Sequence, residues 1–177
     1  MTAQHIKAKV VDRKDFTDDL FCLWFRPETE DGKKFDFKFK PGQYCTIGLQ
    51  GIERAYSIVS APHEEFIELF IELVPSPYGS LTPLLYDLEI GNSVSLRKNA
   101  KGIFTFEPKY KNHVMVATVT GIVPYISIIR DYIHRKNSGH RFFVLHGASY
   151  FDEFVYDEEL NRIMRASVLG IDLQYVP

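Results

Sequence analysis

The chain has very little cysteine, and the little it has forms no recognisable pattern. Cys22 and Cys45 are the only two cysteines among 177 residues, and they do not form a CxxC pair. The sequence therefore offers neither a disulfide framework nor a metal site. Both cysteines lie in apolar alternating segments, which indicates buried free thiols in a reducing compartment.

An excess of charge of one sign is also missing. The 21 basic and 23 acidic residues give a formal net charge of -2, so we expect no nucleic acid partner. No apolar run reaches membrane-spanning length, and residues 1–9 are polar without the apolar core of a signal peptide. We therefore expect a cytoplasmic protein with no membrane association.

Apolar residues are plentiful, at 45% of the chain, which is enough for a packed core. Short alternating segments separated by turn signals occupy residues 4 to about 105, and this pattern predicts a small antiparallel barrel. The expected strands are 5–11, 20–25, 35–39, 44–49, 54–59, 66–74, 93–97 and 103–106. One short helix, 81–87, is expected to interrupt them.

The pattern changes near residue 110. Residues 113–119 form a continuous apolar run, typical of a strand buried on both faces. Helices are expected at 124–135 and 156–165, and further strands at 142–146 and 171–176. Strands and helices alternating in this way predict a parallel α/β unit. The fold class is therefore two domains, an antiparallel β-barrel at 1–108 followed by a parallel α/β nucleotide-binding domain at 109–177 that is incomplete.

Arg54-Ala55-Tyr56-Ser57 is the most informative string in the barrel. On a strand, Arg54 and Tyr56 face one way, while Ala55 and Ser57 face the other. A guanidinium can clamp a pyrophosphate, a tyrosine can lie flat on an aromatic ring system, and a serine can donate to a ring nitrogen. An edge strand with ordinary surface residues explains the same string equally well.

Two turns add to this picture. Residues 77–82 give a glycine-led entry to a short helix, where Ser80 and Thr82 are candidates either for phosphate contacts or for helix capping. Thr120-Gly121 follows a buried strand and opens a helix, at the edge where open α/β sheets bind nucleotides. Each turn, taken alone, is explained more simply by a purely structural role.

Together with the turn Pro41-Gly42-Gln43-Tyr44, these strings occur in an order that resembles the ferredoxin–NADP reductase family, in its bacterial ferredoxin/flavodoxin branch. The resemblance covers nearly all of the chain and implies a six-stranded barrel that holds FAD, and NAD(P)H as the second cofactor. It implies cofactor contacts by Arg54, Ala55, Tyr56, Ser57, Phe70, Ile71, Leu73, Gly79, Ser80, Leu81, Thr82, Thr120 and Gly121.

The resemblance also assigns roles to these residues. Arg54 would contact the pyrophosphate, Tyr56 would stack on the isoalloxazine, and Ser57 would act as the catalytic residue near flavin N5. Residues 70–73 would run beside the flavin, and residues 80–82 would bind the diphosphate. Thr120 and Gly121 would lie where flavin and nicotinamide meet, while His146-Gly147 resembles the nucleotide-side end of the next strand.

The sequence departs from the family pattern at three places. Val119 stands where the family usually has glycine, which makes close approach of a pyrophosphate less favourable. Residues 148–150 lack the arginine that many NADP-using members carry, so we expect little preference for NADPH. The family also continues well past Pro177, and without its later strands residues 113–119 would be an unpaired apolar edge.

The function expected from the resemblance is an FAD-dependent oxidoreductase that passes electrons between NAD(P)H and a one-electron carrier such as ferredoxin or flavodoxin. One alternative is the reductase component of an oxygenase. Another is a catalytically idle flavin-binding or electron-transfer module. Reduction of a bound flavin by NADH or NADPH would separate the enzyme from the idle module.

Overall fold

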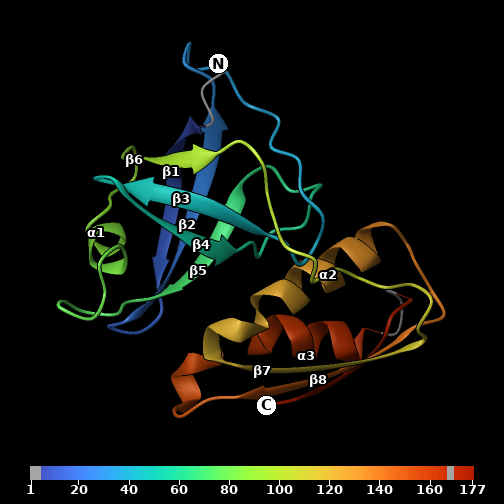
Figure 1. The fold of residues 1–177 in the computed structure, drawn as a ribbon. Coiled ribbons are helices and arrows are strands. Elements are labelled where there is room, and N and C mark those ends of the chain that lie inside the picture. The colour runs from blue at the N-terminus through green and yellow to red at the C-terminus, as the bar shows by residue number, and fades with distance from the viewer. Residues whose placement is uncertain (1–4, 167–169) are drawn as a thin grey trace.

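The computed structural model describes residues 5–166 and 170–177 and contains two domains side by side (Figure 1). The first is a nearly closed antiparallel barrel and the second a three-stranded parallel sheet with helices, which confirms the predicted fold class. Helix α2 (Val123–His134) lies between the barrel and the parallel sheet (Figure 1). No helix in the described residues is long and apolar enough to cross a membrane.

Six strands form the barrel: β1 (His5–Asp15), β2 (Leu20–Glu28), β3 (Tyr44–Leu49), β4 (Ile52–Ser57), β5 (Ile67–Glu72) and β6 (Ser93–Arg97). Their order is β4-β3-β6-β1-β2-β5, and every pairing is antiparallel. Alternation along β1 buries Ile6, Ala8 and Val10 in the barrel core. The amide of Val59 donates to the carbonyl of Glu68 at 2.9 Å, which ties the segment after β4 to β5.

Two predicted barrel strands are absent, and the prediction is wrong for both. Phe35, Phe37 and Phe39 do pack against the barrel core, but residues 35–39 form no ladder. The alternation reported which way the side chains face, whereas a strand also needs a neighbouring backbone to pair with. Residues 103–106 are likewise irregular, and Ile103 is fully exposed. Helix α1 (Thr82–Tyr86) forms where a helix was predicted.

The second domain has the order β7-β8-β9, from β7 (Asn112–Thr118), β8 (Arg141–Gly147) and β9 (Asp172–Val176), all parallel. After β7 comes η1 (Val119–Ile122), which runs directly into α2. After β8 come η2 (Phe151–Glu153) and α3 (Asp157–Arg165). Strand β7 is therefore an edge, as predicted.

Helices α2 and α3 both lie on the side of this sheet that faces the barrel (Figure 1). Met115 and Ala117 of β7 are buried beneath them. Val114 and Val116 point the other way and are 69% and 63% exposed. The prediction that β7 is buried on both faces is therefore wrong for the described residues, although its sequence is apolar on both.

One apolar cluster joins the domains. Leu20, Cys22, Val59 and Phe70 from the barrel side pack together with residues of α2 and α3. Both cysteines are buried free thiols, as predicted. Because apolar packing of this kind has no preferred direction, it holds the domains together without by itself setting the angle between them.

Candidate functional site

Strand β4 and the turn before α1 meet through Arg54 and Ser80. One terminal nitrogen of Arg54, Nη2, donates to Ser80 Oγ at 3.0 Å, and Nη1 donates to the carbonyl of Glu53 at 2.8 Å. Both Arg54 and Ser80 are exposed. The structure thus brings together the two segments from which the sequence predicted pyrophosphate contacts, and it presents a cation and a hydroxyl at one place.

Tyr56 and Ser57 follow on the same strand. Tyr56 is half-buried, since part of its ring packs against the barrel core and it pairs with Cys45 of β3. Burial raises the pKa of Tyr56 to about 12, so the phenol stays protonated at neutral pH. Ser57 is half-buried at the end of β4, and Ala55 is exposed. A regular strand therefore carries this tetrapeptide.

The predicted flavin-side residues of β5 are buried in two different cores. Phe70 lies in the cluster between the domains, edge-on to Tyr156 with ring centroids 5.6 Å apart. Ile71 lies in the barrel core, and Leu73, just after β5, is half-buried against it. The side chains of Phe70 and Ile71 hold β5 in place, so a ligand beside them would meet main-chain atoms.

The turn before α1 is built around Gly79. A Cβ on Gly79 would lie 1.8 Å from the carbonyl oxygen of Val74, so only glycine fits. Thr82 Oγ1 accepts from the amide of Val74 at 3.0 Å and donates to its carbonyl at 2.9 Å. Leu81 is buried in the barrel core. No side chain caps α1, so Ser80 and Thr82 are not its capping residues.

The predicted nucleotide turn lies at the carboxyl ends of the parallel strands. Val119 opens η1 at φ 39°, in the left-handed region that a β-branched residue rarely adopts. Its carbonyl accepts a hydrogen bond from His146 Nε2 at 3.1 Å. Burial lowers the pKa of His146, which favours the neutral imidazole. His146 thus braces the turn that carries Thr120 and Gly121.

The glycines at the ends of β7 and β8 have no structural need to be glycine. Gly121 lacks a positive φ, and a Cβ there would lie 3.6 Å from the Cβ of Ala117, an ordinary contact. Gly147 is similar, with its nearest neighbour, Thr118 Cγ2, also at 3.6 Å. Both are exposed. Glycine at both positions is explained if another molecule approaches the backbone closely.

These segments of the two domains lie beside the same strand. Strand β5 is next to β4 in the barrel and also contacts η1 of the second domain. The strand that carries Arg54, Tyr56 and Ser57 and the 3-10 turn that carries Gly121 therefore both contact β5, from different domains. Of the residues named from the sequence, Phe70, Ile71, Leu81 and Thr82 are occupied in holding this arrangement.

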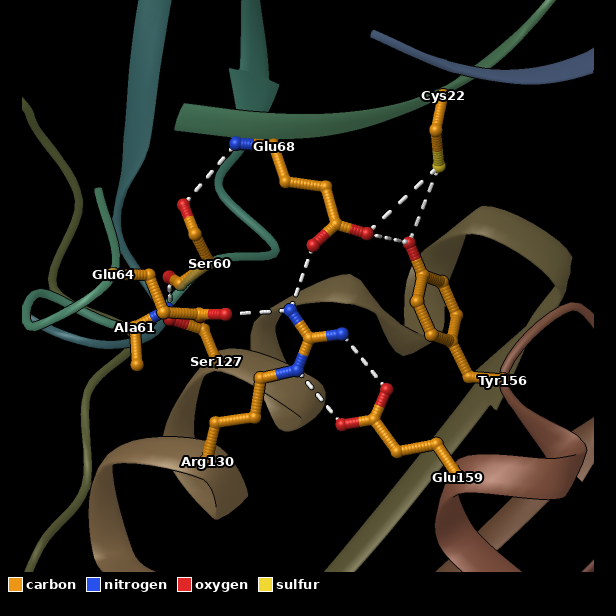
Figure 2. Close-up of polar contacts among 9 residues, drawn as sticks. All are labelled: Cys22, Ser60, Ala61, Glu64, Glu68, Ser127, Arg130, Tyr156 and Glu159. Atoms are coloured by element: carbon orange, nitrogen blue, oxygen red, sulfur yellow. Dashed lines mark hydrogen bonds and ion pairs between the residues drawn. The ribbon is translucent and has the colours of Figure 1, made fainter. Parts of the chain in front are cut away.

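Sequence reasoning missed the polar contacts that join the domains. Arg130 of α2 is not among the site residues named from the sequence, yet its guanidinium contacts three carboxylates (Figure 2). Burial acts to lower the pKa of Arg130, but Glu159 and Glu68 outweigh it and raise that pKa above the usual range. No local sequence signal could have found this network, because its acids are 29 to 66 residues from Arg130 along the chain.

Comparison with known proteins agrees with this geometry. The oxidoreductase NAD-binding domain family matches residues 115–176. The chain is 30% identical to a flavodoxin/ferredoxin–NADP reductase of Buchnera aphidicola subsp. Baizongia pistaciae, over 89% of this chain and 62% of the relative. It is also 30% identical to the protein of the same name from Escherichia coli K12, over 87% of this chain and 60% of the relative.

Among solved structures, a ferredoxin NADP+ reductase from Neisseria gonorrhoeae with bound FAD and NADP has a TM-score of 0.83 and 25% identity, and the match covers 99% of this chain and 68% of that one. The chain spans about 60% of the length of the curated reductases given above. Sequence, fold and comparisons agree that this chain is similar to the ferredoxin–NADP reductases.

Proposed function

We propose that this chain binds FAD on its barrel and transfers electrons between NAD(P)H and a one-electron carrier such as ferredoxin or flavodoxin. The observation that carries the proposal is that β4 and the turn with Gly121 contact the same strand, β5, from two domains. A flavin on one side and a nicotinamide on the other would meet there. The proposal assigns residues 1–108 to the flavin and 109–177 to the nicotinamide nucleotide.

The residues present fit a flavin dinucleotide. The exposed guanidinium of Arg54 and the hydroxyl of Ser80 supply a cation and a donor for a pyrophosphate at one place. Tyr56 has the shape to cover a flat ring, and Ser57 at the end of β4 has a hydroxyl to donate to a ring nitrogen. Bound FAD would supply the redox chemistry, since a flavin exchanges hydride with a nicotinamide and single electrons with a carrier.

The chain itself would bind and orient. Gly121 and Gly147 would let a nucleotide approach the carboxyl edge of the parallel sheet. Gly79 and Thr82 hold the turn that presents Ser80 to Arg54. This role needs no strong acid or base. We also place the reaction in a reducing compartment, the cytoplasm, which the two free thiols favour.

Nucleotide choice follows from the loop after β8. The amides of Ser149 and Tyr150 both donate to Glu153 Oε2, at 2.7 and 3.0 Å. A carboxylate therefore stands on the loop where many NADP-using relatives carry an arginine, and it would repel a 2′-phosphate. We expect no preference for NADPH over NADH. A preference of about a hundredfold, roughly 2.7 kcal/mol, would contradict this.

The reductase component of an oxygenase is a second candidate. The chain is 27% identical, over 81% of its length and 42% of the relative, to a protein named methane monooxygenase component C from Methylosinus trichosporium. Both candidates require FAD and a reduced nicotinamide. They differ in the protein that accepts the electrons, so reduction of ferredoxin or flavodoxin against reduction of an oxygenase separates them.

The test begins with flavin content and anaerobic reduction of the bound flavin by NADH and NADPH. Arg54→Ala and Tyr56→Ala should each lower the FAD retained, with stacking contributing on the order of 1 kcal/mol beyond burial. Gly121→Ala should leave FAD content unchanged and slow reduction, because its Cβ has space in the protein itself. Unchanged FAD content in both barrel variants would refute the flavin assignment, and an unreduced flavin would favour the idle module.

A further inference from the structure

Arg130 connects three elements at the junction of the domains (Figure 2). From α2, its Nη1 donates to Glu68 Oε2 of β5 at 2.7 Å. Its Nε and Nη2 donate to the two oxygens of Glu159 on α3, both at 2.7 Å. Glu64, in the loop before β5, lies 3.5 Å from Nη1. One planar guanidinium therefore ties the barrel to both helices of the α/β domain.

The contacts to Arg130 are largely shielded from water. The side chains of Arg130 and Glu68 are 18% and 7% exposed. Glu68 also accepts from Tyr156 Oη at 2.8 Å, so a second side chain from the α/β domain meets the same carboxylate. Desolvation offsets much of the attraction within a buried ion pair, so the pair adds little net stability, whereas the planar fork of Arg130 fixes the directions of its hydrogen bonds.

A third polar contact crosses the junction close by. Ser127 Oγ, one turn before Arg130 on α2, donates to the carbonyl of Ser60 at 2.8 Å. Ser60 Oγ in turn accepts from the amide of Glu68 at 3.1 Å. The polar contacts made by Arg130, Tyr156 and Ser127 thus converge on Glu68 and Ser60, beside an apolar cluster that has no preferred direction.

Helix α2 and strand β5 both adjoin the candidate site. Helix α2 begins immediately after the Gly121 turn, and Arg130 lies about 10 Å along it from Val123 at 1.5 Å per residue. Glu68 lies two residues from Phe70 on β5. Because a helix and a paired strand are rigid over this length, fixing Arg130 against Glu68 also fixes the Gly121 turn against β5.

We propose that Arg130 is a positioning residue whose pairing with Glu68 sets the angle between the two domains, and with it the approach of the nucleotide turn to β5. The part of the proposal that concerns the domain angle depends only on the structure. The consequence for reduction of the flavin by NAD(P)H rests on the proposed function. An error of about 1 Å between reacting groups can cost on the order of a hundredfold in rate, so a modest change of angle is sufficient to matter.

The angle can be measured without any cofactor. Cys22 and Cys45 are buried, so spin labels on Glu89→Cys in the barrel and Glu158→Cys on α3 would react selectively at two exposed positions. Arg130→Lys keeps the charge but loses the fork that reaches Glu68 and Glu159 together. We expect a narrow distribution of label distances in the otherwise unchanged protein, and a broader or shifted one with Arg130→Lys.

Arg135→Lys is the matched control. Arg135 is the C-cap of the same helix. It pairs at 2.7 Å with Asp131 of that helix and does not cross to the barrel in this pair. The label distances should not change with this variant. Should Arg130→Lys fail to fold, Glu68→Gln keeps the shape and an acceptor oxygen while removing the charge, and it should broaden the distribution in the same direction.

Stopped-flow reduction of the flavin tests the consequence. With Arg130→Lys we expect the limiting rate to fall about tenfold or more, with unchanged FAD content and a nucleotide dissociation constant within about threefold. Unchanged label distances in both Arg130→Lys and Glu68→Gln would overturn the proposal, as would altered distances with an unchanged limiting rate. A protein that binds no flavin would refute the proposed function instead, and the label distances would still decide whether the pair sets the angle.

Discussion

Val119 offers a sharp test of the backbone at the nucleotide turn. Its φ of 39° places a β-branched residue in the left-handed region, where the Cβ crowds the following carbonyl oxygen. Its side chain is only half-buried against the junction cluster. Replacing Val119 by alanine and by glycine removes nearly the same side chain, so the difference between the two variants reports the backbone.

The expected difference can be worked from two terms. The left-handed conformation costs a non-glycine residue roughly 1–2 kcal/mol. Glycine loses more freedom on folding than alanine does, at a cost of about 0.5–1 kcal/mol. We therefore expect Val119→Gly to have a free energy of unfolding about 0.7 kcal/mol above that of Val119→Ala, which is the reverse of the usual order.

Urea unfolding followed by the fluorescence of Trp24, the single tryptophan, provides the assay. Trp24 packs against the junction cluster and so reports the contact between the domains. Thr120 has no positive φ and serves as the control, because Thr120→Ala should have a higher free energy of unfolding than Thr120→Gly. If the free energy of unfolding of Val119→Ala equals or exceeds that of Val119→Gly, the inference of backbone strain at Val119 is refuted.

Three further outcomes are expected. Gly42→Ala should lower the melting temperature more than Gly139→Ala. Both glycines have a positive φ, 89° and 80°, but a Cβ on Gly42 would lie 2.2 Å from the carbonyl oxygen of Phe104, whereas a Cβ on Gly139 would have no atom within 4 Å. Equal losses of melting temperature would contradict the clash at Gly42. Burial lowers the pKa of His146 below its usual 6.5, so just below pH 6.5 the unfolded chain binds more protons than the folded protein does. The free energy of unfolding should therefore fall as the pH drops through 6.5. In urea titrations at several pH values, His146→Gln should make this dependence of the unfolding free energy on pH less steep. Alternate amides of Asn112–Thr118 should exchange hydrogen quickly while those of β8, paired on both sides, stay protected; uniform protection of both strands would mean that the edge is covered.

Local patterns predicted what is locally determined. The barrel strand with Arg54 and the turn with Gly79 were found because alternation and turn residues act over a few positions. Alternation at 35–39 failed as a strand because pairing depends on a distant backbone that the segment does not meet. The apolar run at 113–119 correctly predicted a strand of about this length, but the prediction that both of its faces are buried was wrong. Residue type does not say which face of a strand a helix will cover.

The residues of the candidate site likewise divide into those that local patterns identify and those that depend on contacts with distant parts of the chain. Arg54 and Ser80 were named separately for one ligand, and the structure places them in contact. Phe70 was named for the flavin, but its side chain belongs to the junction, a role that depends on residues of the other domain. Arg130 could not be found, because its acidic partners come from a loop, a strand and a second helix that only the fold brings together.

The difference between core residues and exposed site residues decides where a substitution tests ligand binding without also changing the packing. Strand β5 holds the barrel core through Ile71, the junction through Phe70 and the ion pair through Glu68, so a lost ligand after a change at one of these residues can also reflect altered packing. Arg54 and Gly121 are exposed and support no core, so their substitution leaves the fold in place. Loss of bound flavin in the Arg54 variant, or slower flavin reduction by NAD(P)H in the Gly121 variant, can then be attributed to ligand binding and not to the scaffold.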